Sequence, residues 1–193
     1  MTKIAVVFHS GYGHTAKVAE SVLHGVQSVA GTEARLVPVG DVEQHWDFLD
    51  GADGIIFGSP TYMGSASAPM KAFIDSTSGR WMKQAWKDKI AAGFTNSASQ
   101  SGDKLDTLVQ FVVFASQMHM IWVGLDLLPG NNSSQGSTED LNRLGSSTGL
   151  MTQSNADQSP DVAPPAGDLA TAEHFGKRVA TATRQWVAGR NAL

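Results

Sequence analysis

The chain has 193 residues, of which 41% are hydrophobic and 17% charged, and it carries a net charge of −4 at pH 7 with a pI near 5.8. The excess of acidic side chains argues against a nucleic-acid or anionic-membrane surface, because both partners require clustered Lys and Arg. The absence of cysteine excludes disulfides, thiolate catalysis and Cys-ligated metals.

No segment of the sequence is typical of targeting or membrane insertion. The apolar runs are far shorter than the ~20 residues that a membrane span needs. The N-terminus enters a strand pattern almost at once, which leaves no room for a signal peptide. We therefore expect a cytoplasmic protein. Because the sequence shows no internal repeat or boundary, we expect a single domain over residues 1–193.

The first predicted elements are buried strands and an amphipathic helix. Residues 4–8, "IAVVF", form a continuous apolar run that is typical of a strand buried on both faces. Apolar residues then recur at helical spacing over residues 15–30, and Gly31 follows as a natural stop. Residues 35–39 predict a short strand, and "DGIIFG" at 53–58 predicts another buried one.

The second half of the chain continues this pattern. The spacing predicts a helix over 69–75, a strand over 89–95 ("KIAAGFT") and an apolar helix over 105–118. The last strand signal covers residues 120–128, and an amphipathic helix over 169–188 closes the chain.

The alternation of strands and helices predicts the fold class. It is typical of an α/β protein whose parallel sheet is covered by helices on both faces, in three α/β/α layers. Five strands fit the doubly wound order 2-1-3-4-5, and ligands of such sheets bind outside the carboxyl ends of the strands. The loops after predicted strands 1, 3 and 4 are therefore where a functional site is expected.

Residues 129–168 interrupt this alternation. They are rich in Gly, Ser, Asn, Thr and Pro, and their periodicity is weak. A structureless loop of this length is uncommon inside a compact domain unless it is functional or disordered. Two interpretations stay open: a surface excursion or tail, or a segment that partly orders over a bound ligand or a neighbouring subunit.

The loop after the first strand reads "SGYGHT" (residues 10–15) and leads into a helix. A strand, a Gly-containing loop and a helix N-terminus together form an anion site, because free backbone N–H groups and the helix dipole point at the loop. The loop lacks the Lys of a Walker A motif, and Ala16 stands where a dinucleotide motif has its third glycine. Its hydroxyls suit a phosphate monoester, unless Ser10 or Thr15 merely caps the helix.

Two further loops share this character. "GSPTYMGS" (58–65) and "TNSASQSG" (95–102) also leave buried strand ends and consist mostly of small polar residues. Such residues let backbone groups approach a flat polar heterocycle closely. Three loops of this kind on one rim predict a site for a phosphate tail that carries a planar ring.

These motifs carry a family resemblance. With "SGYGHT", "IIFGSPTYMGSASAPMKAFID", "GRW" and "FTNSASQSG" at matching spacings, the chain resembles flavodoxin-like FMN proteins. It resembles most closely the NAD(P)H:quinone oxidoreductases of the WrbA type. The resemblance covers residues 2 to about 124, with a weaker match in the last helix. It implies a flavodoxin-like fold with FMN as cofactor, NAD(P)H and quinones as small-molecule partners, and a homodimer or homotetramer whose pockets are completed across subunits.

The resemblance also implies site residues. The FMN phosphate would be wrapped by Ser10, Gly11, Tyr12, Gly13, His14 and Thr15. One edge of the isoalloxazine ring would lie along Pro60, Thr61, Tyr62, Met63 and Gly64. The pyrimidine side of the ring would bind Asn96, Ser97, Ala98, Ser99, Gln100 and Ser101. The nicotinamide or quinone pocket would be lined by Tyr12 and Trp81.

The chain departs from the family in three places. Ala98 and Gln100 replace glycines, the histidine that the family places near the flavin falls on Ser116, and residues 131–137 match poorly. These departures concern the substrate pocket more than the cofactor.

Other kinds of site find less support. The six histidines show no metal-ligand spacing, "GSPTYMG" is not a nucleophile elbow, and the first strand ends without the carboxylates of a phosphoacceptor domain. Trp86, Trp122 and Trp186 are interpreted as core or interface residues, and Trp81, Met82 and Trp86 as apolar surface compatible with an oligomer.

The predicted function is therefore an FMN-dependent enzyme that transfers two electrons from NAD(P)H to quinones, by ping-pong kinetics on one flavin face, with no catalytic side chain required. A one-electron carrier flavodoxin is the alternative, although the net charge of −4 is modest for such a protein. An NAD(P)H-dependent FMN reductase is a third possibility.

Overall fold

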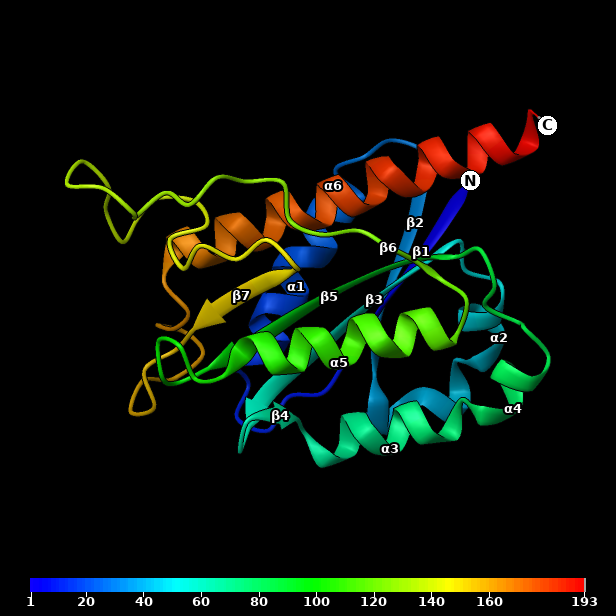
Figure 1. Ribbon diagram of the computed structural model, residues 1–193, viewed down its shortest axis with the longest axis horizontal. Helices are drawn as coiled ribbons and strands as arrows, with labels where there is room; N and C mark the ends of the chain where they lie inside the picture. Colours follow the sequence, from blue (N-terminus) through cyan, green and yellow to red (C-terminus); the bar gives the residue numbers. More distant parts are fainter. Residues whose placement is uncertain (193) are drawn as a thin grey trace.

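A computed structural model describes residues 1–192 and shows a parallel sheet between two layers of helices (Figure 1). The strands follow the order β2-β1-β3-β5-β6, and every neighbouring pair is parallel. This order confirms the predicted doubly wound fold. The strands on this path are β2 (Thr32–Pro38), β1 (Thr2–Phe8), β3 (Gly54–Tyr62), β5 (Ile90–Ser97) and β6 (Ile121–Trp122). The short β4 (Ser65–Ala66) pairs antiparallel with the end of β3.

Helices cover both faces of the sheet. Two long helices lie side by side on one face, and two others cover the opposite face (Figure 1). The first pair is α1 (His14–Gln27) with α6 (Ala166–Asn191), and the second is α3 (Ala68–Ser76) with α5 (Lys104–Gln117). A 3-10 turn (Val39–Gln44) leads into the short α2 (Trp46–Asp50), and α4 (Ser78–Met82) follows α3.

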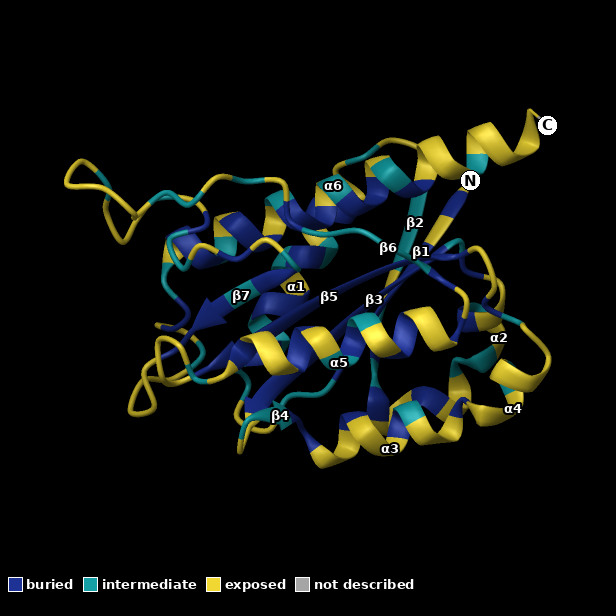
Figure 2. Ribbon diagram, in the orientation of Figure 1, coloured by how far each residue is buried: buried dark blue, intermediate teal, exposed yellow. Residues whose placement is uncertain are grey.

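The core lies on both sides of the central strands, which are buried over most of their length (Figure 2). Successive side chains of a strand point to opposite faces. Ile4 and Val6 of β1 therefore pack toward α1 and α6, whereas Ala5 and Val7 pack toward α3 and α5. Burial on two faces explains why the central strands are continuous apolar runs in the sequence.

The fifth strand is interrupted, and the predicted strand over 120–128 is wrong in its extent. Its first part, β6, pairs with Ile90 and Ala91 of β5 for two residues. A second part, β7 (Leu150–Gln153), pairs with β5 from Phe94 to Ser97. The intervening apolar residues Leu125 and Leu127 pack with the core cluster under α1 and α6. Their hydrophobicity therefore reflects burial rather than strand pairing.

Residues 129–168 divide into two regions with different surroundings. The part around 129–141 is mostly exposed and projects from the body of the protein (Figure 1). Its base is fastened by Asn142, whose side chain bonds Leu127 O at 2.9 Å and Ser146 O at 3.0 Å. The later part forms β7 and then returns to the carboxyl end of the sheet. The first part of the segment is thus a surface excursion, and the later part is an ordered wall; its ordering over a ligand stays a prediction.

The amino ends of the strands are closed by packing. Trp86 is fully buried, stacks against Phe57 and Phe73, and donates from Nε1 to Asp50 Oδ1 at 2.8 Å. The expectation that Trp86 contributes exposed apolar surface is therefore wrong. Its neighbour Lys89 is also buried, and its ammonium donates to the carbonyls of Leu49, Asp50 and Ala52. Lys89 thereby caps the C-terminal end of α2.

Within residues 1–192, no helix combines the length and the apolar character that crossing a bilayer would require.

Candidate functional site

A cleft of about 920 Å³ opens at the carboxyl ends of β1, β3 and β5. It lies where the doubly wound topology predicts a ligand. Its walls come from the three predicted loops and from residues 154–160, which follow β7. No Lys or Arg of residues 1–192 lines the cleft. A ligand there would therefore be held by neutral donors.

The loop after β1 presents a helix N-terminus without a side-chain cap. Gly13 is the N-cap residue of α1 and adopts the left-handed region at φ 90°, which glycine tolerates. Ser10 Oγ accepts a hydrogen bond from the Gly13 N–H at 3.1 Å, and no side chain caps the first turn of α1. The interpretation that Ser10 or Thr15 merely caps the helix is therefore wrong. The N–H groups of this turn are therefore free to bind an anion, which is the role that the motif predicts for them.

The loop after β3 packs against the loop after β1. A Cβ atom on Gly11 would lie 2.5 Å from the Tyr62 hydroxyl oxygen, so a larger residue there would displace the tip of the Tyr62 side chain. The rings of Tyr12 and Tyr62 meet edge to face with centroids 6.3 Å apart. Burial raises the pKa of Tyr62, and the neighbouring Tyr12 adds to the shift. Tyr62 therefore stays neutral at physiological pH, and with Tyr12 and the exposed Met63 it forms an apolar rim.

Buried hydroxyls fix the floor of the cleft. Thr61 Oγ1 lies 2.7 Å from Thr95 Oγ1 and 2.8 Å from Thr107 Oγ1. These contacts join the ends of β3 and β5 to α5. Because all three hydroxyls are satisfied inside the protein, the strand ends are held rigidly under the loops.

The loop after β5 turns its carbonyl groups away from the cleft. Gln153 Nε2 donates to Ala98 O at 2.9 Å, and Lys104 Nζ donates to Ser99 O at 2.9 Å and to Gln100 O at 2.7 Å. The C=O and N–H groups of trans peptides point in opposite directions. The next N–H groups in the chain, those of Ser99, Gln100 and Ser101, therefore point to the side opposite these bound carbonyls, and they donate no hydrogen bond within residues 1–192.

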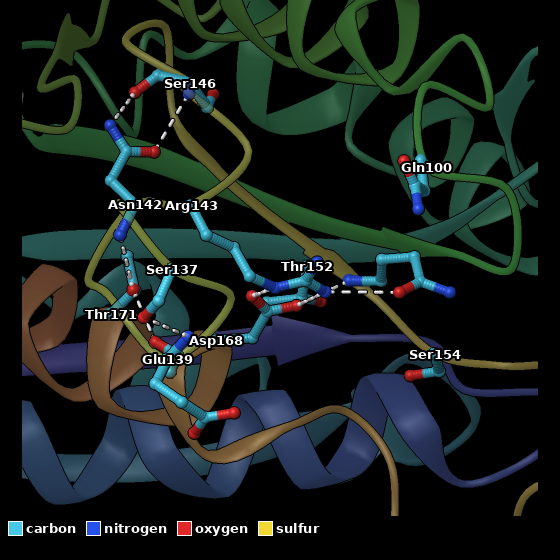
Figure 3. Close-up of polar contacts among 12 residues, drawn as sticks. Gln100, Ser137, Glu139, Asn142, Arg143, Ser146, Thr152, Ser154, Asp168 and Thr171 are labelled. Carbon is cyan, nitrogen blue, oxygen red and sulfur yellow. Dashed lines mark hydrogen bonds and ion pairs between the residues drawn. The ribbon is translucent and has the colours of Figure 1, made fainter. Parts of the chain in front are cut away.

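An ion pair holds this arrangement from behind (Figure 3). Arg143 and Asp168 form two hydrogen bonds of 2.7 and 3.0 Å, and both side chains are almost fully buried. Arg143 also donates to Gln153 Oε1 at 3.1 Å, while Asp168 Oδ2 accepts from the Gln153 N–H at 2.8 Å. Gln153 is thus fixed in position to bind the Ala98 carbonyl.

Asn96 lies at the inner wall of the cleft. Its Oδ1 accepts hydrogen bonds from Thr152 Oγ1 at 2.9 Å and Ser154 Oγ at 3.1 Å. These two bonds fix the orientation of the amide, so its NH₂ group is left to face a ligand.

Most predicted site residues come together around this cleft. Its lining includes Tyr12, His14, Thr15, Pro60, Thr61, Tyr62, Met63, Gly64, Asn96, Ser97, Ala98 and Ser99. The remaining loop residues, Ser10, Gly11, Gly13, Gln100 and Ser101, belong to the same loops without lining the cleft directly.

Trp81 and Ser116 do not line this cleft within the one chain that the structure describes. Trp81 lies on α4, beside a small hollow of about 150 Å³ that it shares with Phe114 and Met118. Ser116 is exposed in the last turn of α5, where it donates to Val112 O. This helix starts at the cleft, and at 1.5 Å per residue Ser116 is about 18 Å along it from Lys104.

The sequence did not identify one wall of the cleft. Ser154, Ala156, Gln158, Ser159 and Pro160 line it, and so do Gly102 and Asp103. His14 Nε2 lies 2.8 Å from Gln158 O, and a Cβ atom on Gly13 would lie 2.5 Å from Pro160 Cγ. The sequence holds one signal for this wall. The weak periodicity of residues 129–168 suggests that part of this segment orders over a ligand, and residues 154–160 lie within it.

The residues of the cleft fit FMN. One end offers the uncapped first turn of α1, which suits a phosphate monoester. The other end offers the free N–H groups of residues 99–101, which suit the carbonyl oxygens of a flat heterocycle. Its volume falls within the range of about 300–1,000 Å³ that is usual for small-molecule sites. Fold and site together define a flavin-nucleotide-binding protein of the flavodoxin-like class.

Comparisons with known proteins agree with this class. A family model described as NADPH-dependent FMN reductase matches residues 30–131. Flavodoxin FldP of Pseudomonas aeruginosa is 44% identical, over 96% of this chain and 98% of its own. An NAD(P)H dehydrogenase (quinone) of Methanosarcina acetivorans is 30% identical, over 98% and 100%. The structure of a flavodoxin, WrbA-like protein from Agrobacterium tumefaciens is 38% identical, covers 96% of this chain and 99% of that one, and has a TM-score of 0.74.

The chain therefore belongs to the NADPH-dependent FMN reductase family and is a flavodoxin-like protein of the WrbA type. The predicted resemblance is confirmed, and so is FMN as the cofactor. In broad terms the protein is a flavin oxidoreductase.

Proposed function

We propose that the protein is an FMN-dependent NAD(P)H:quinone oxidoreductase in which donor and acceptor use the same open side of the cleft in turn. The observation that carries this proposal is the cleft itself. Its volume, about 920 Å³, is near the upper end for small-molecule sites, and Tyr12 and Met63 stand exposed at its mouth. This leaves room for a planar substrate beside the cofactor, which an electron carrier does not need.

When bound, FMN supplies the chemistry by taking two electrons and a proton from NAD(P)H and passing two electrons to a quinone, which gains two protons. The protein's own residues bind and orient. The first turn of α1 holds the phosphate, and the N–H groups of residues 99–101 hold the ring. Tyr12 and Tyr62 form the aromatic wall on which a quinone or nicotinamide packs. Water at the open mouth provides the protons, so no side chain acts as nucleophile.

A one-electron carrier is the second candidate, favoured by the 44% identity to a protein named flavodoxin. A carrier typically steers toward its partners through a strongly acidic surface. The net charge of −4 over 193 residues gives little such steering. An FMN reductase that releases reduced flavin shares the first half of the proposed reaction and is the third candidate.

One anaerobic experiment separates these candidates. The protein is loaded with FMN and mixed with NADH or NADPH, and bleaching of the visible flavin absorbance is followed before and after addition of benzoquinone. Rapid bleaching that benzoquinone reverses supports the quinone oxidoreductase and identifies its donor. Reduced flavin that separates from the protein on gel filtration would favour the reductase. Bound FMN that neither nucleotide bleaches would overturn the proposal in favour of the carrier.

We also propose that the protein assembles as a homodimer or homotetramer. Trp81 is 44% exposed and Met82 is 78% exposed on α4, and such exposed apolar side chains favour association. Light scattering of the FMN-loaded protein at micromolar concentration tests this, and a monomer mass would contradict it.

A further inference from the structure

Lys104 is a buried lysine directly behind the wall of the cleft. Its side chain is 1% exposed, at the first residue of α5. The ammonium donates to Ser97 Oγ at 2.8 Å, to Ser99 O and to Gln100 O, which satisfies all three of its protons. Ser97 and Ser99 themselves line the cleft. Only the thickness of this loop therefore separates the ammonium from whatever the loop binds.

The charge of Lys104 is not cancelled by a direct partner. Asp168 of α6 is the nearest attractive charge, but both of its carboxylate oxygens already bind Arg143, whose guanidinium repels the ammonium. Burial lowers the pKa of Lys104 to about 8, so the group is still charged at neutral pH. No Lys or Arg of residues 1–192 lines the cleft, so the Lys104 ammonium, which binds the loop that forms the wall, supplies positive charge from behind that wall.

We propose that Lys104 is a positioning residue that turns the N–H groups of residues 99–101 toward FMN and stabilises its reduced, more negative form through a positive charge behind the loop. A charge near the ring is one of the ways in which a protein tunes a flavin. The inference rests on the proposed placement of the FMN ring against this loop.

The expected change in midpoint potential follows from the affinities of the same site for oxidised and for reduced FMN. Removal of one charge at this buried position should weaken binding of reduced FMN about tenfold more than binding of oxidised FMN. For a two-electron couple, a tenfold ratio corresponds to a midpoint potential about 30 mV lower. Loss of the loop-orienting hydrogen bonds should weaken both forms together.

The experiment measures FMN affinity and midpoint potential in the wild type and three variants. Lys104→Met removes the charge and the hydrogen bonds, and Lys104→Gln removes the charge but keeps an NH₂ donor. Lys89→Met is the matched control. Lys89 is also a buried lysine with three hydrogen bonds, all to carbonyls, but it lies at the opposite end of the sheet. Both Lys104 variants should have the lowered potential, whereas Lys89→Met should keep the wild-type value.

The pH dependence provides a second readout that needs no folded Lys104 variant. The positive charge of Lys104 should raise the wild-type midpoint potential at pH 7. This contribution should be lost by pH 10, because Lys104 deprotonates between the two pH values. Arg143 and Asp168, the other charges near Lys104, form an ion pair with each other. Burial raises the pKa of Tyr62 above its ordinary value of 10, so this ring stays neutral through most of the window. If the Lys104 variants do not fold, a break near pH 8 in the potential of Lys89→Met carries the test, because Lys89 also has a pKa of about 8 and that variant removes it.

Each outcome separates this inference from the proposed function. An unchanged potential in FMN-loaded Lys104→Met and Lys104→Gln, or a wild-type potential without a break near pH 8, overturns the role of Lys104. A wild-type potential in Lys104→Gln alone assigns the effect to hydrogen bonding and overturns the role of charge. Failure of the wild type to bind FMN would instead overturn the placement of the cofactor.

Discussion

The two ends of the sheet place the same side chain in opposite settings. At the amino ends, Lys89 donates to three carbonyls beneath the stacked rings of Trp86, Phe57 and Phe73, and the region is closed by apolar packing. At the carboxyl ends, Lys104 donates to a hydroxyl and two carbonyls of a loop whose other side is open. A buried lysine thus completes a packed end in one case and prepares a binding surface in the other.

This contrast separates the sources of stability from the sources of binding. Apolar contacts, which supply most of the free energy of folding, concentrate at the closed end and between the layers. Backbone N–H groups without internal partners concentrate at the open end, where a ligand can satisfy them. Substitutions at the closed end should therefore change stability, and substitutions at the open end should change affinity.

The largest effect is expected at the closed end. Trp86→Ala leaves a cavity in the core and removes the partner of Asp50, so the free energy of unfolding should fall by about 3–5 kcal/mol. Urea unfolding measures this loss, and Trp186→Ala, at a ring that is 37% exposed, is the control with a smaller loss. FMN affinity of the folded variant should be unchanged. A large loss of affinity would show that the two ends are coupled.

At the open end, Thr15→Glu should weaken FMN binding at least ~100-fold, because it places a carboxylate against the phosphate at the start of α1. Thr15 is almost fully buried but lines the cleft, so the larger side chain can extend into the opening, and a carboxylate at a helix N-terminus is favourable. Fluorescence titration with FMN measures the affinity, and circular dichroism checks the fold. Thr15→Val is the control, because it removes only the hydroxyl and should cost no more than about tenfold. Retained tight binding in Thr15→Glu would contradict the phosphate site.

Stability should depend on pH through Lys89. Burial lowers its pKa from 10.5 to about 8, so between these values the unfolded chain binds more protons than the folded one. The free energy of unfolding attributable to Lys89 should therefore rise with pH across this window, by up to about 3 kcal/mol. Urea unfolding of the wild type and of Lys89→Met from about pH 7.5 to about pH 10.5 measures this contribution as the difference between the two unfolding free energies. Parallel curves for the two proteins would show that Lys89 titrates normally.

The smallest effect is expected for Trp81→Ala. Its ring is 44% exposed and lies away from the cleft of its own chain, so stability should change by less than about 1 kcal/mol and FMN affinity should not change. Isothermal titration and urea unfolding measure both. A several-fold rise in the quinone KM with FMN still bound would instead place α4 of a neighbouring subunit near the cleft.

The sequence predicted the parts of the fold whose signal is local. The helices α1 and α5 and the strands β1, β3 and β5 were found within a few residues, because their apolar spacing reflects the faces they bury. The anion loop "SGYGHT" was recognisable because a helix N-terminus needs no distant partner to attract a phosphate.

The missed features depend on contacts between residues far apart in the chain. Residues 154–160 reach the cleft because β7 pairs with β5, more than 50 residues earlier, and small polar residues carry no pattern that predicts this. Trp86 stands in "KQAWKDK", which is typical of a surface, yet Asp50 and three aromatic rings bury it. Lys104 follows "SGD" and looks like an exposed helix start, although the loop folds over it.

Asn142 holds the base of the projecting loop, so the loop beyond it can change in length. Its side chain joins Leu127 O to Ser146 O, and its backbone N–H donates to Thr171 Oγ1, so the base of the loop is closed independently of its tip (Figure 3). Loop-closure entropy grows slowly, by about 0.6 kcal/mol for each doubling of length. Insertion of a tag, a fluorescent reporter or a second domain within residues 131–137 should therefore leave the flavin cleft undisturbed, whereas residues 138 and 139 pack against Gly167 at the start of α6.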